Sequence, residues 1–475
     1  MADPQPLSGR RVGSFAYLTI KDRLPVILTK VIDFLCREKV SIGKQYGEAA
    51  QEGCKEVIGR LSQLKNEMQT NKPFRILQAD PSASPHDDSD EYNRELEKFT
   101  IENEDQPKWF TAPWLYAECY MYARIHEAFY LCDPLRGFDP FLVQKQKALV
   151  DSKTAVDCLT KRVVTACNSV SNFTQQLLKQ YVIQLLEVCL WGNRCDLSIS
   201  GGADRAQESD IFSSLDKLRP QILDNNADLL WQLLVSLPED QRDLVLVLDN
   251  AGFELVSDLC FLTFLMESAL ATSVTIHTKT RPWFVSDTLH SDLMWTIEKL
   301  REFGDSNAEM ANKWANYLSS GQWKISENKF WTQHHDFASM NEVDPRLYSE
   351  LCKASLVIFK GDLNYRKLTG DLDWPTNTSF QRALRGFSPA PILVLRVWWA
   401  YAERTAAAAM EHQSMADPAV TAPAHLTNTH STTTLIRDVT FDLYNIPYLM
   451  HCLLSLSNPV SHSPDALPRN LFVTA

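Results

Sequence analysis

The chain has 475 residues, of which 45% are hydrophobic and 22% charged, proportions typical of folded globular proteins. These values argue against a largely disordered chain, and the length suggests two or three domains. The formal net charge is −12, which argues against a nucleic-acid-binding protein that relies on a broad basic surface. A small anionic substrate stays compatible with this charge, because it needs only a local pocket of positive charge.

The cysteines and the apolar segments bear on the location of the protein. Eleven cysteines, none in a Cys-x-x-Cys pair, lack the dense pattern of a disulfide-stabilised secreted protein or the paired spacing of a structural zinc site. The first residues show no apolar stretch of signal-peptide length, and no run of about 18 apolar residues predicts a membrane-spanning helix. We therefore expect a cytoplasmic or nuclear protein with neither a membrane nor a nucleic acid as partner.

The first 200 residues show mainly helical periodicity. Three segments carry apolar residues at helical spacing: 24–35, 57–68 and 141–188. The aromatic stretch 109–134 is typical of a buried helix, with Thr111 as its N-cap. We predict a short lead, residues 1–18, followed by a mostly helical domain, residues 19–200.

The middle of the chain has a different pattern. Residues 244–248 (LVLVL) form a short apolar run without alternation, which is typical of a strand covered on both faces. Further strands are predicted at 273–277, 283–285 and 356–359. Helical segments alternate with these strands at 255–270, 289–303 and 345–354. The alternation predicts an α/β domain over residues 201–396, with a Rossmann-like, mostly parallel sheet and flanking helices.

The end of the chain differs from the rest. Lys367 is the last lysine and Gly386 the last glycine, and residues 405–434 are rich in Ala, Thr and His without a clear period. Such a stretch does not predict a packed unit. We therefore expect residues 397–475 to form an irregular, disordered tail.

Polar residues follow two of the predicted strands. Asp249 and Asn250 come directly after the predicted strand 244–248, and Asp287 follows the short strand-like segment 283–285. Ligands of parallel sheets bind at the carboxyl ends of the strands, and oxygen donors there suit a hard cation such as Mg²⁺ or Mn²⁺. An alternative has about equal support: Asp249 or Asn250 caps the following helix, with Glu254 completing a capping box, and Asp287 caps the next one.

A second group of polar residues, 360–367 (KGDLNYRK), also follows a predicted strand. Lys360 and Arg366 can neutralise a phosphate, with the guanidinium as a bidentate fork, and Gly361 lets the backbone approach a ligand. The alternative is a solvated charged turn. The chain has neither a GxGxxG nor a Walker A pattern, so a dinucleotide or P-loop site has no support.

Two further patterns are weaker. Residues 191–193 (WGN), followed by Asp196, end a helical run, where a Gly-Asn cap accounts for them as well as a ligand contact does. Residues 334–336 (HHD) contain two adjacent histidines, but adjacent side chains diverge and no carboxylate lies at i+4 spacing. We therefore disfavour a metal site there.

Five blocks of the sequence together resemble one known family. They are WFTAPWLYAECYMYARI, LWGNRCDLSIS, LVLVLDNAGFELVSDL, TRPWFVSD and LVIFKGDLNYRKLTGD, in this order along the chain. The combination resembles the damage-control phosphatase family (domain of unknown function 89), in its eukaryotic acidic-residue methyltransferase-like subfamily, over residues 15–396. The resemblance implies a helical N-terminal part followed by a Rossmann-like α/β sheet. It also implies hydrolysis of sugar phosphates such as fructose 1-phosphate and fructose 6-phosphate in metabolite damage control, with manganese, cobalt, nickel or magnesium.

The resemblance also implies roles for individual residues. The family's metal ligands match Asp249, Asn250 and Asp287, and the first two of these are also the implied catalytic and substrate-contacting residues. The remaining implied substrate contacts are Lys360, Asp362, Leu363, Asn364, Tyr365 and Arg366. Water and the Asp249 carboxylate both stay open as the nucleophile.

A second activity is described for the same subfamily, an S-adenosylmethionine-dependent carboxyl methyltransferase acting on protein glutamates. Glu254 and Asp287 match its proposed cofactor contacts. This alternative has no independent signature in the sequence, because the glycine-rich loop usual in nucleotide-binding folds is missing.

The chain departs from the family at one motif. Residues 387–391 (FSPAP) are present and Arg396 fits the arginine of the family's Arg-Thr-x-Lys motif, but Val397, Trp398 and Trp399 follow. The motif lysine is therefore absent. A positioned cation on a transferring phosphoryl group contributes on the order of 3 kcal/mol, or about a hundredfold in rate, so a catalytically impaired isoform is a further alternative.

Overall fold

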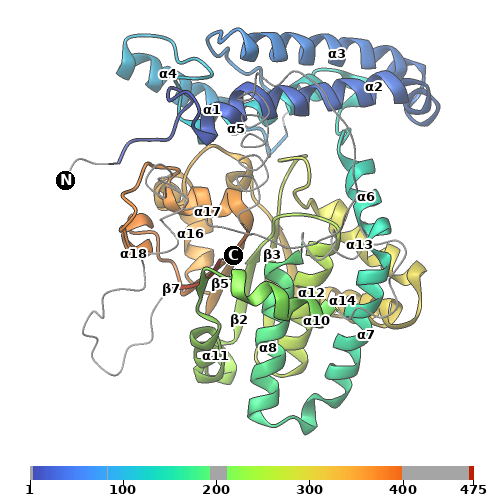
Figure 1. The fold of residues 1–475 in the computed structure, drawn as a ribbon. Helices are drawn as coiled ribbons and strands as arrows, with labels where there is room; N and C mark the ends of the chain where they lie inside the picture. Colours follow the sequence, from blue (N-terminus) through green and yellow to red (C-terminus); the bar gives the residue numbers. More distant parts are fainter. Residues whose placement is uncertain (1–3, 83, 193–210, 398–469, 475) are drawn as a thin grey trace, which may run out of the picture.

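A computed structural model describes residues 4–82, 84–192, 211–397 and 470–474, and its chain begins with a layer of helices (Figure 1). This N-terminal layer consists of α1 (Phe15–Leu18), the π-helix η1 (Thr19–Arg23), α2 (Leu24–Tyr46), α3 (Glu48–Gln69), α4 (Ser89–Asn103), α5 (Trp114–Tyr130) and the short 3-10 helix η2 (Asp133–Leu135). The aromatic helix α5 is buried along nearly its whole length, as predicted. Its N-cap is Pro113 and not the predicted Thr111, whose hydroxyl bonds the backbone of Lys108 instead.

The predicted helical run 141–188 is divided into several helices. They are α6 (Leu142–Asp151), α7 (Lys153–Ser169), the 3-10 helix η3 (Val170–Asn172) and α8 (Gln175–Leu190). Side chains of α7 and α8 share one hydrophobic core with α12 and with the sheet. Residues from both sides of residue 200 contribute to this core. The predicted domain boundary at residue 200 stays a prediction.

Beyond residue 210, strands and helices alternate, and the α/β class with a mostly parallel sheet is confirmed. The strands are β1 (Asp224–Asn225), β2 (Asp243–Val247), β3 (Ser273–Thr278), β4 (Trp323–Glu327), β5 (Leu356–Lys360), β6 (Ile392–Arg396) and β7 (Asn470–Thr474). Their order in the sheet is β1-β7-β6-β5-β2-β3-β4, with only the β1–β7 pair antiparallel among these strands. One segment of the predicted irregular tail, the strand β7, thus lies beside β6.

The helices between the strands cover both faces of the sheet. They are α10 (Ile211–Leu218), α11 (Ala227–Ser236), α12 (Phe253–Glu267), α13 (His290–Phe303), α14 (Asp305–Ser320), α15 (Met340–Val343), α16 (Pro345–Leu351), α17 (Gly361–Thr369) and α18 (Phe380–Ala383). Short 3-10 turns complete the set: η4 (Arg219–Gln221), η5 (Glu239–Gln241), η6 (Lys329–Thr332) and η7 (Phe337–Ser339).

Strand β2 shows why its sequence lacks alternation. Leu244 and Leu246 point into the core formed with α12, whereas Val245 and Val247 point into a second core that contains Trp331 and the helices around it. Because both faces are covered, all four side chains are apolar. The buried strand predicted from LVLVL is therefore confirmed.

The strand predicted at 283–285 is wrong. Phe284 and Val285 have positive φ angles of 42° and 72°, which end any extended conformation. Trp283 and Phe284 instead pack against Tyr122 of α5, with ring centroids 5.6 and 4.6 Å apart. The segment is a loop that joins the edge of the sheet to the N-terminal layer.

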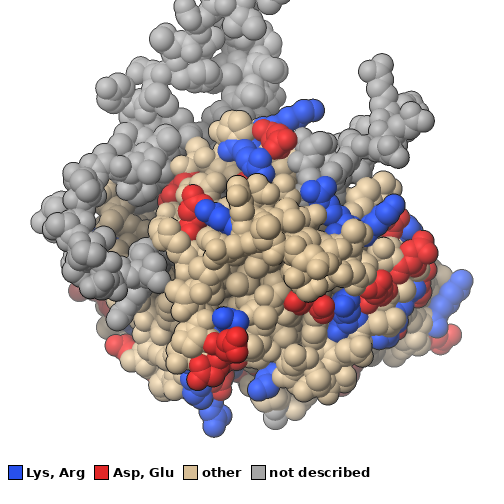
Figure 2. Space-filling model, turned by 90° about the horizontal axis from the view of Figure 1, so that it is seen from below, with Lys and Arg blue, Asp and Glu red and all other residues tan. Residues whose placement is uncertain are grey.

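Charged side chains are distributed over the surface in both signs. Figure 2 shows Lys and Arg beside Asp and Glu around the rim of one face, with uncharged residues in its middle. Among the described residues, no helix is both long and apolar enough to cross a membrane.

Candidate active site

A cavity of about 450 Å³ lies where the carboxyl ends of β2, β5 and β6 meet the N-terminal layer. The N-terminal layer lines it with Phe15, Arg23, Trp114 and Glu118. The sheet and its loops line it with Asp249, Asn250, Glu254, Phe284, Ser286, Asp287, Lys360, Gly361, Asp362, Leu363, Arg366, Leu395, Arg396 and Val397, and α8 adds Leu190. The carboxyl edge of the sheet is where ligands of such folds bind, so this cavity is the candidate active site.

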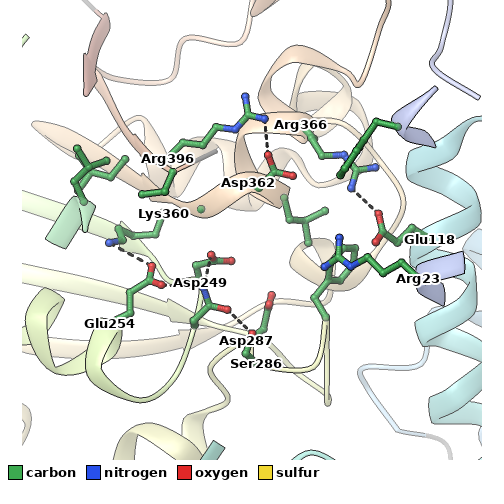
Figure 3. Close-up of a pocket in the computed structure, with 18 of the residues that line it drawn as sticks. Arg23, Glu118, Asp249, Glu254, Ser286, Asp287, Lys360, Asp362, Arg366 and Arg396 are labelled. Carbon is green, nitrogen blue, oxygen red and sulfur yellow. Dashed lines mark hydrogen bonds and ion pairs between the residues drawn. The ribbon is translucent and has the colours of Figure 1, made fainter. Parts of the chain in front are cut away.

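The three residues predicted to bind a metal lie together in this cavity. Asp249 and Asn250 follow β2, and backbone hydrogen bonds hold the loop after β3 against them: Ala251 N donates to Ser286 O (2.8 Å) and Thr288 N to Asp249 O (2.8 Å). Asn250 and Asp287 thereby form an isolated β-bridge. Figure 3 shows the side chains of Asp249 and Asp287 pointing into the same space.

The capping alternative for these residues is wrong. The N-cap of α12 is Gly252, and no side chain caps that helix. The N-cap of α13 is Leu289, where the Asp292 carboxylate accepts from the Leu289 backbone, so Asp287 caps nothing. The residues after both strands are therefore available for a ligand.

Hydrogen bonds fix the amide of Asn250. Its Nδ2 donates to Asp249 Oδ2 and to Glu254 Oε2, both at 2.8 Å, and its Oδ1 accepts from the Ser286 hydroxyl. The amide nitrogen thus faces the carboxylates. The amide oxygen faces the loop that carries Asp287. We name the four cavity residues Asp249, Asn250, Glu254 and Asp287 the acidic edge.

The acidic edge, taken together with its ion-pair partners, carries more negative than positive charge. The edge and its ion-pair partners comprise four carboxylates and two lysines: Asp249, Glu254, Asp258, Asp287, Lys279 and Lys360. Burial raises the pKa of Asp249 well above its ordinary value, and the charges of Asp287 and Glu254 raise it further. Burial also raises the pKa of Asp287, although Lys279 lies 3.1 Å from its Oδ2.

This charge distribution fits a divalent cation. Buried carboxylates that repel one another become stable as anions when a cation joins them, and carboxylate and amide oxygens are hard donors. Among the described residues, no group of three His, Cys, Asp or Glu side chains is arranged to hold a metal. A cation here would therefore depend on two carboxylates, Asp249 and Asp287, together with the Asn250 amide.

Gly361 allows the start of α17 to approach the acidic edge. It has φ +86°, and a Cβ atom at this position would lie 1.9 Å from Asp249 Oδ2. No other residue fits there without moving Asp249. Gly361 was predicted to let the backbone approach a ligand, and the group that it approaches in the structure is the Asp249 carboxylate.

Lys360 lies beneath the acidic edge and is almost fully buried. Its Nζ donates to Asp258 Oδ1 (2.8 Å) and to Cys189 O (2.6 Å), and it lies 3.3 Å from Glu254 Oε1. An ammonium group has three donors, so these contacts use its full capacity. Lys360 therefore holds carboxylates in place, which differs from the phosphate contact predicted for it.

Arg366 connects the cavity to the N-terminal layer. Its Nε and Nη2 bond the two carboxylate oxygens of Asp371 at 3.0 Å, and its Nη1 donates to Glu118 Oε2 (2.6 Å). The guanidinium also lies 3.6 Å from the ring centroid of Trp114. The predicted solvated turn at 360–367 is wrong, because Lys360 and Arg366 are both buried.

The other predicted residues of this block are divided. Asp362 and Leu363 line the cavity, whereas the Asn364 amide donates to Lys360 O (2.8 Å) and Tyr365 stacks on Phe380. Burial would raise the pKa of Asp362, but Arg396, 2.6 Å away, lowers it below its ordinary value. The structure thus places Asn364 and Tyr365 behind the cavity.

Sequence reasoning missed several cavity residues: Arg23, Glu118 and Ser286. Arg23 and Glu118 belong to helices of the N-terminal layer, more than a hundred residues before the strands. No local spacing links them to the strand ends. Glu118 and Ser286 stood in segments that the sequence already marked, whereas Arg23 stood in none.

The described residues of the weaker sequence patterns do not line the cavity. His334 is buried beside Tyr92 and Tyr116, and burial lowers its pKa well below the ordinary value. Gly192 packs against Glu254, with its ideal Cβ position 3.1 Å from the Glu254 Cα. Asn193, Asp196, Trp398 and Trp399 lie outside the described residues.

Known proteins are similar to this sequence over most of its length. A family model, the damage-control phosphatase ARMT1-like domain, matches residues 19–404. The damage-control phosphatase ARMT1 of Homo sapiens is 43% identical over 405 residues, which cover 83% of this chain and 90% of that protein. Those of Danio rerio and Xenopus laevis are 41% and 42% identical over 405 residues, covering 83% of this chain and 89% and 91% of their own. The chain therefore belongs to the family of damage-control phosphatase ARMT1-like domains.

Proposed function

We propose that the protein is a divalent-metal-dependent phosphatase for small phosphate esters, with sugar phosphates of the fructose 1-phosphate and fructose 6-phosphate type as substrates. The main support is the cavity itself, in which an acidic edge with surplus negative charge faces a group of arginines. The edge suits a cation and the arginines suit phosphate oxygens. Membership of a phosphatase family agrees with this arrangement.

A cation at the acidic edge would be held by Asp249, Asn250 and Asp287. When bound, it would polarise the phosphoryl group and activate water. Hydrolysis breaks the bond between phosphorus and the sugar oxygen, while the oxygen of water joins phosphorus and a proton passes to the sugar oxygen.

The residues of the chain itself supply position and charge. Arg366 has five N–H donors, three of which bond Asp371 and Glu118, so the remaining donors can bind phosphate oxygens. The hydrogen bond from Asn250 fixes Asp249 Oδ2 against the start of α17. Fixed groups need no reorganisation when charge develops, which favours catalysis.

The methyltransferase alternative has less support. Glu254, the implied cofactor contact, uses one carboxylate oxygen for Asn250 and the other for Lys360. Calorimetry with S-adenosylmethionine and labelling of a protein acceptor would test this alternative directly. The impaired-isoform alternative is tested by comparison with a variant that carries an intact Arg-Thr-x-Lys segment.

The primary test is a screen of sugar phosphates with Mn²⁺, Co²⁺, Ni²⁺ and Mg²⁺ in turn. We expect metal-stimulated release of phosphate, and we expect Asp249→Ala to reduce it by at least about a hundredfold. Thermal unfolding should show that this variant still folds. Glu327→Ala, an exposed acid at the end of β4 outside the cavity, is the control and should keep wild-type turnover. Metal-stimulated turnover of Asp249→Ala at the wild-type rate contradicts the proposal.

A further inference from the structure

The N-terminal layer places in the cavity one cation that forms no ion pair with any described carboxylate. Arg23 is the last residue of the π-helix η1, directly before α2, and its exposed side chain lines the cavity. Figure 3 shows it reaching toward the space between Asp287 and Arg366. Single π-helical turns are rare and occur often at functional sites, because they reorient the side chains that follow.

The other cavity cations differ from Arg23 in their partners. Arg366 is paired with Glu118 and Asp371, and Arg396 with Asp362. Among the described residues that line the cavity, Arg23 is the cation whose side chain makes no hydrogen bond or ion pair. The guanidinium of Arg23 is therefore available to pair with a bound anion.

An unpaired arginine at a protein surface is ordinarily just solvated, but two observations separate Arg23 from that case. Lys21, two residues earlier on the same π-helix, is exposed as well and does not line the cavity. Burial would raise the pKa of Asp362, yet the charges of Arg396, Arg366 and, with the smallest effect of the three, Arg23 lower it, so Arg23 also acts on a residue that lines the cavity.

We propose that Arg23 is a substrate-binding residue, whose guanidinium contacts the phosphate of the sugar phosphate. The inference rests on the proposed function and extends it, because it assigns part of substrate recognition to the N-terminal layer. A guanidinium can bond two phosphate oxygens at once, and such charge-assisted bonds are among the strongest in proteins. The helical layer and the sheet then build one site together.

The experiment measures binding of inorganic phosphate to the full-length protein with Mn²⁺, by calorimetry, together with KM for fructose 6-phosphate. Arg23→Gln should weaken phosphate binding and raise KM by on the order of tenfold to a hundredfold. Arg23→Lys should recover part of this loss, since it keeps the charge but not the fork. Lys21→Gln removes the same charge from the same π-helix and should match the wild type. Folding should be unaffected, because the Arg23 side chain makes no hydrogen bond or ion pair in the described part of the chain.

Equal phosphate affinity in Arg23→Gln and the wild type would overturn the role of Arg23. Equal weakening in Lys21→Gln and Arg23→Gln would overturn it as well, since only a diffuse charge effect would remain. If the wild type itself neither binds phosphate nor hydrolyses any ester with any metal, the proposed function fails, and this result is distinct from the first two.

Discussion

The two sides of the cavity are built on opposite principles. The acidic edge and its ion-pair partners together comprise four carboxylates and two lysines, so negative charge is in excess until a cation binds. We name Arg23, Arg366 and Arg396 the arginine wall, and two of its three members are already paired with carboxylates. The negative charge of the acidic edge is thus balanced only when a cation binds, whereas two of the three arginines of the wall are already paired without a ligand.

The two sides also differ in how far apart their parts lie in the sequence. The acidic edge comes from the loop and helix that follow β2 and from the loop that follows β3, and hydrogen bonds hold the two loops together. The wall depends on Arg366 and Glu118, which are 248 residues apart. A change at Arg366 should therefore weaken the whole fold, and a change at the acidic edge should mainly affect chemistry.

The largest effect on stability is expected for Arg366→Met. It leaves Glu118 and Asp371 buried without a counter-charge, and removing one partner of a buried pair costs about 3–5 kcal/mol. Urea unfolding measures the loss. The control is Arg37→Met, which breaks the pair with Asp33, whose side chains are 75% and 51% exposed, and should cost less than about 1 kcal/mol. Similar losses in both variants would show that the buried ion pairs of Arg366 stabilise the fold no more than an exposed pair does.

A smaller loss of stability, but a large loss of turnover, is expected for Gly361→Ala. The new Cβ collides with Asp249 Oδ2, and at φ +86° it adds backbone strain, for a total of about 1–3 kcal/mol. Displacement of Asp249 should reduce metal-stimulated turnover at least about tenfold. Gly137→Ala is the matched control, since Gly137 has φ +78° with no heavy atom near its Cβ position, so it shares only the strain. Full activity of Gly361→Ala would show that the position of Asp249 does not matter.

The smallest effect concerns His277 of β3, which accepts a hydrogen bond from the Trp331 indole at 3.2 Å. Burial, with a smaller effect of Lys279, lowers the pKa of His277 from 6.5 to about 4. Below pH 6.5 the unfolded chain gains a proton that the folded protein does not bind, so stability falls as pH drops toward 4. The slope from this residue is about 1.4 kcal/mol per pH unit.

His277→Gln should remove this component while keeping an acceptor for the indole. The measurement is the free energy of unfolding in urea across the window from pH 6.5 to about 4, as the difference between variant and wild type. That difference should shift in favour of the variant as pH falls. Parallel curves would mean that His277 does not titrate on unfolding.

Much of the fold follows from local patterns in the sequence. The run LVLVL predicted a strand covered on both faces, which β2 is, and the aromatic stretch predicted the buried helix α5. Asp249 and Asn250 stand at a strand end, so their place at the edge of the sheet was fixed by the chain order alone. Local periodicity predicts these features, because the spacing of apolar side chains along the chain differs between elements buried on one face and elements buried on both.

Other features depend on contacts that no local pattern contains. Residues 283–285 have strand-forming side chains, yet packing against Tyr122 folds them into a loop. Lys360 stands where a phosphate ligand is expected, but Asp258, one turn beyond Glu254 on α12, takes its charge. Tertiary packing overrides propensity where a large buried contact is gained.

The sequence by itself determined the fold class, the family and the placement of Asp249 and Asn250 directly after β2. Only the tertiary structure decided which charges are neutralised, and it brought Arg23 and Glu118 to the cavity from the N-terminal layer. The physical reason is that strand ends meet by the geometry of a parallel sheet, whereas ion pairs between distant helices and strands exist only once the chain has packed.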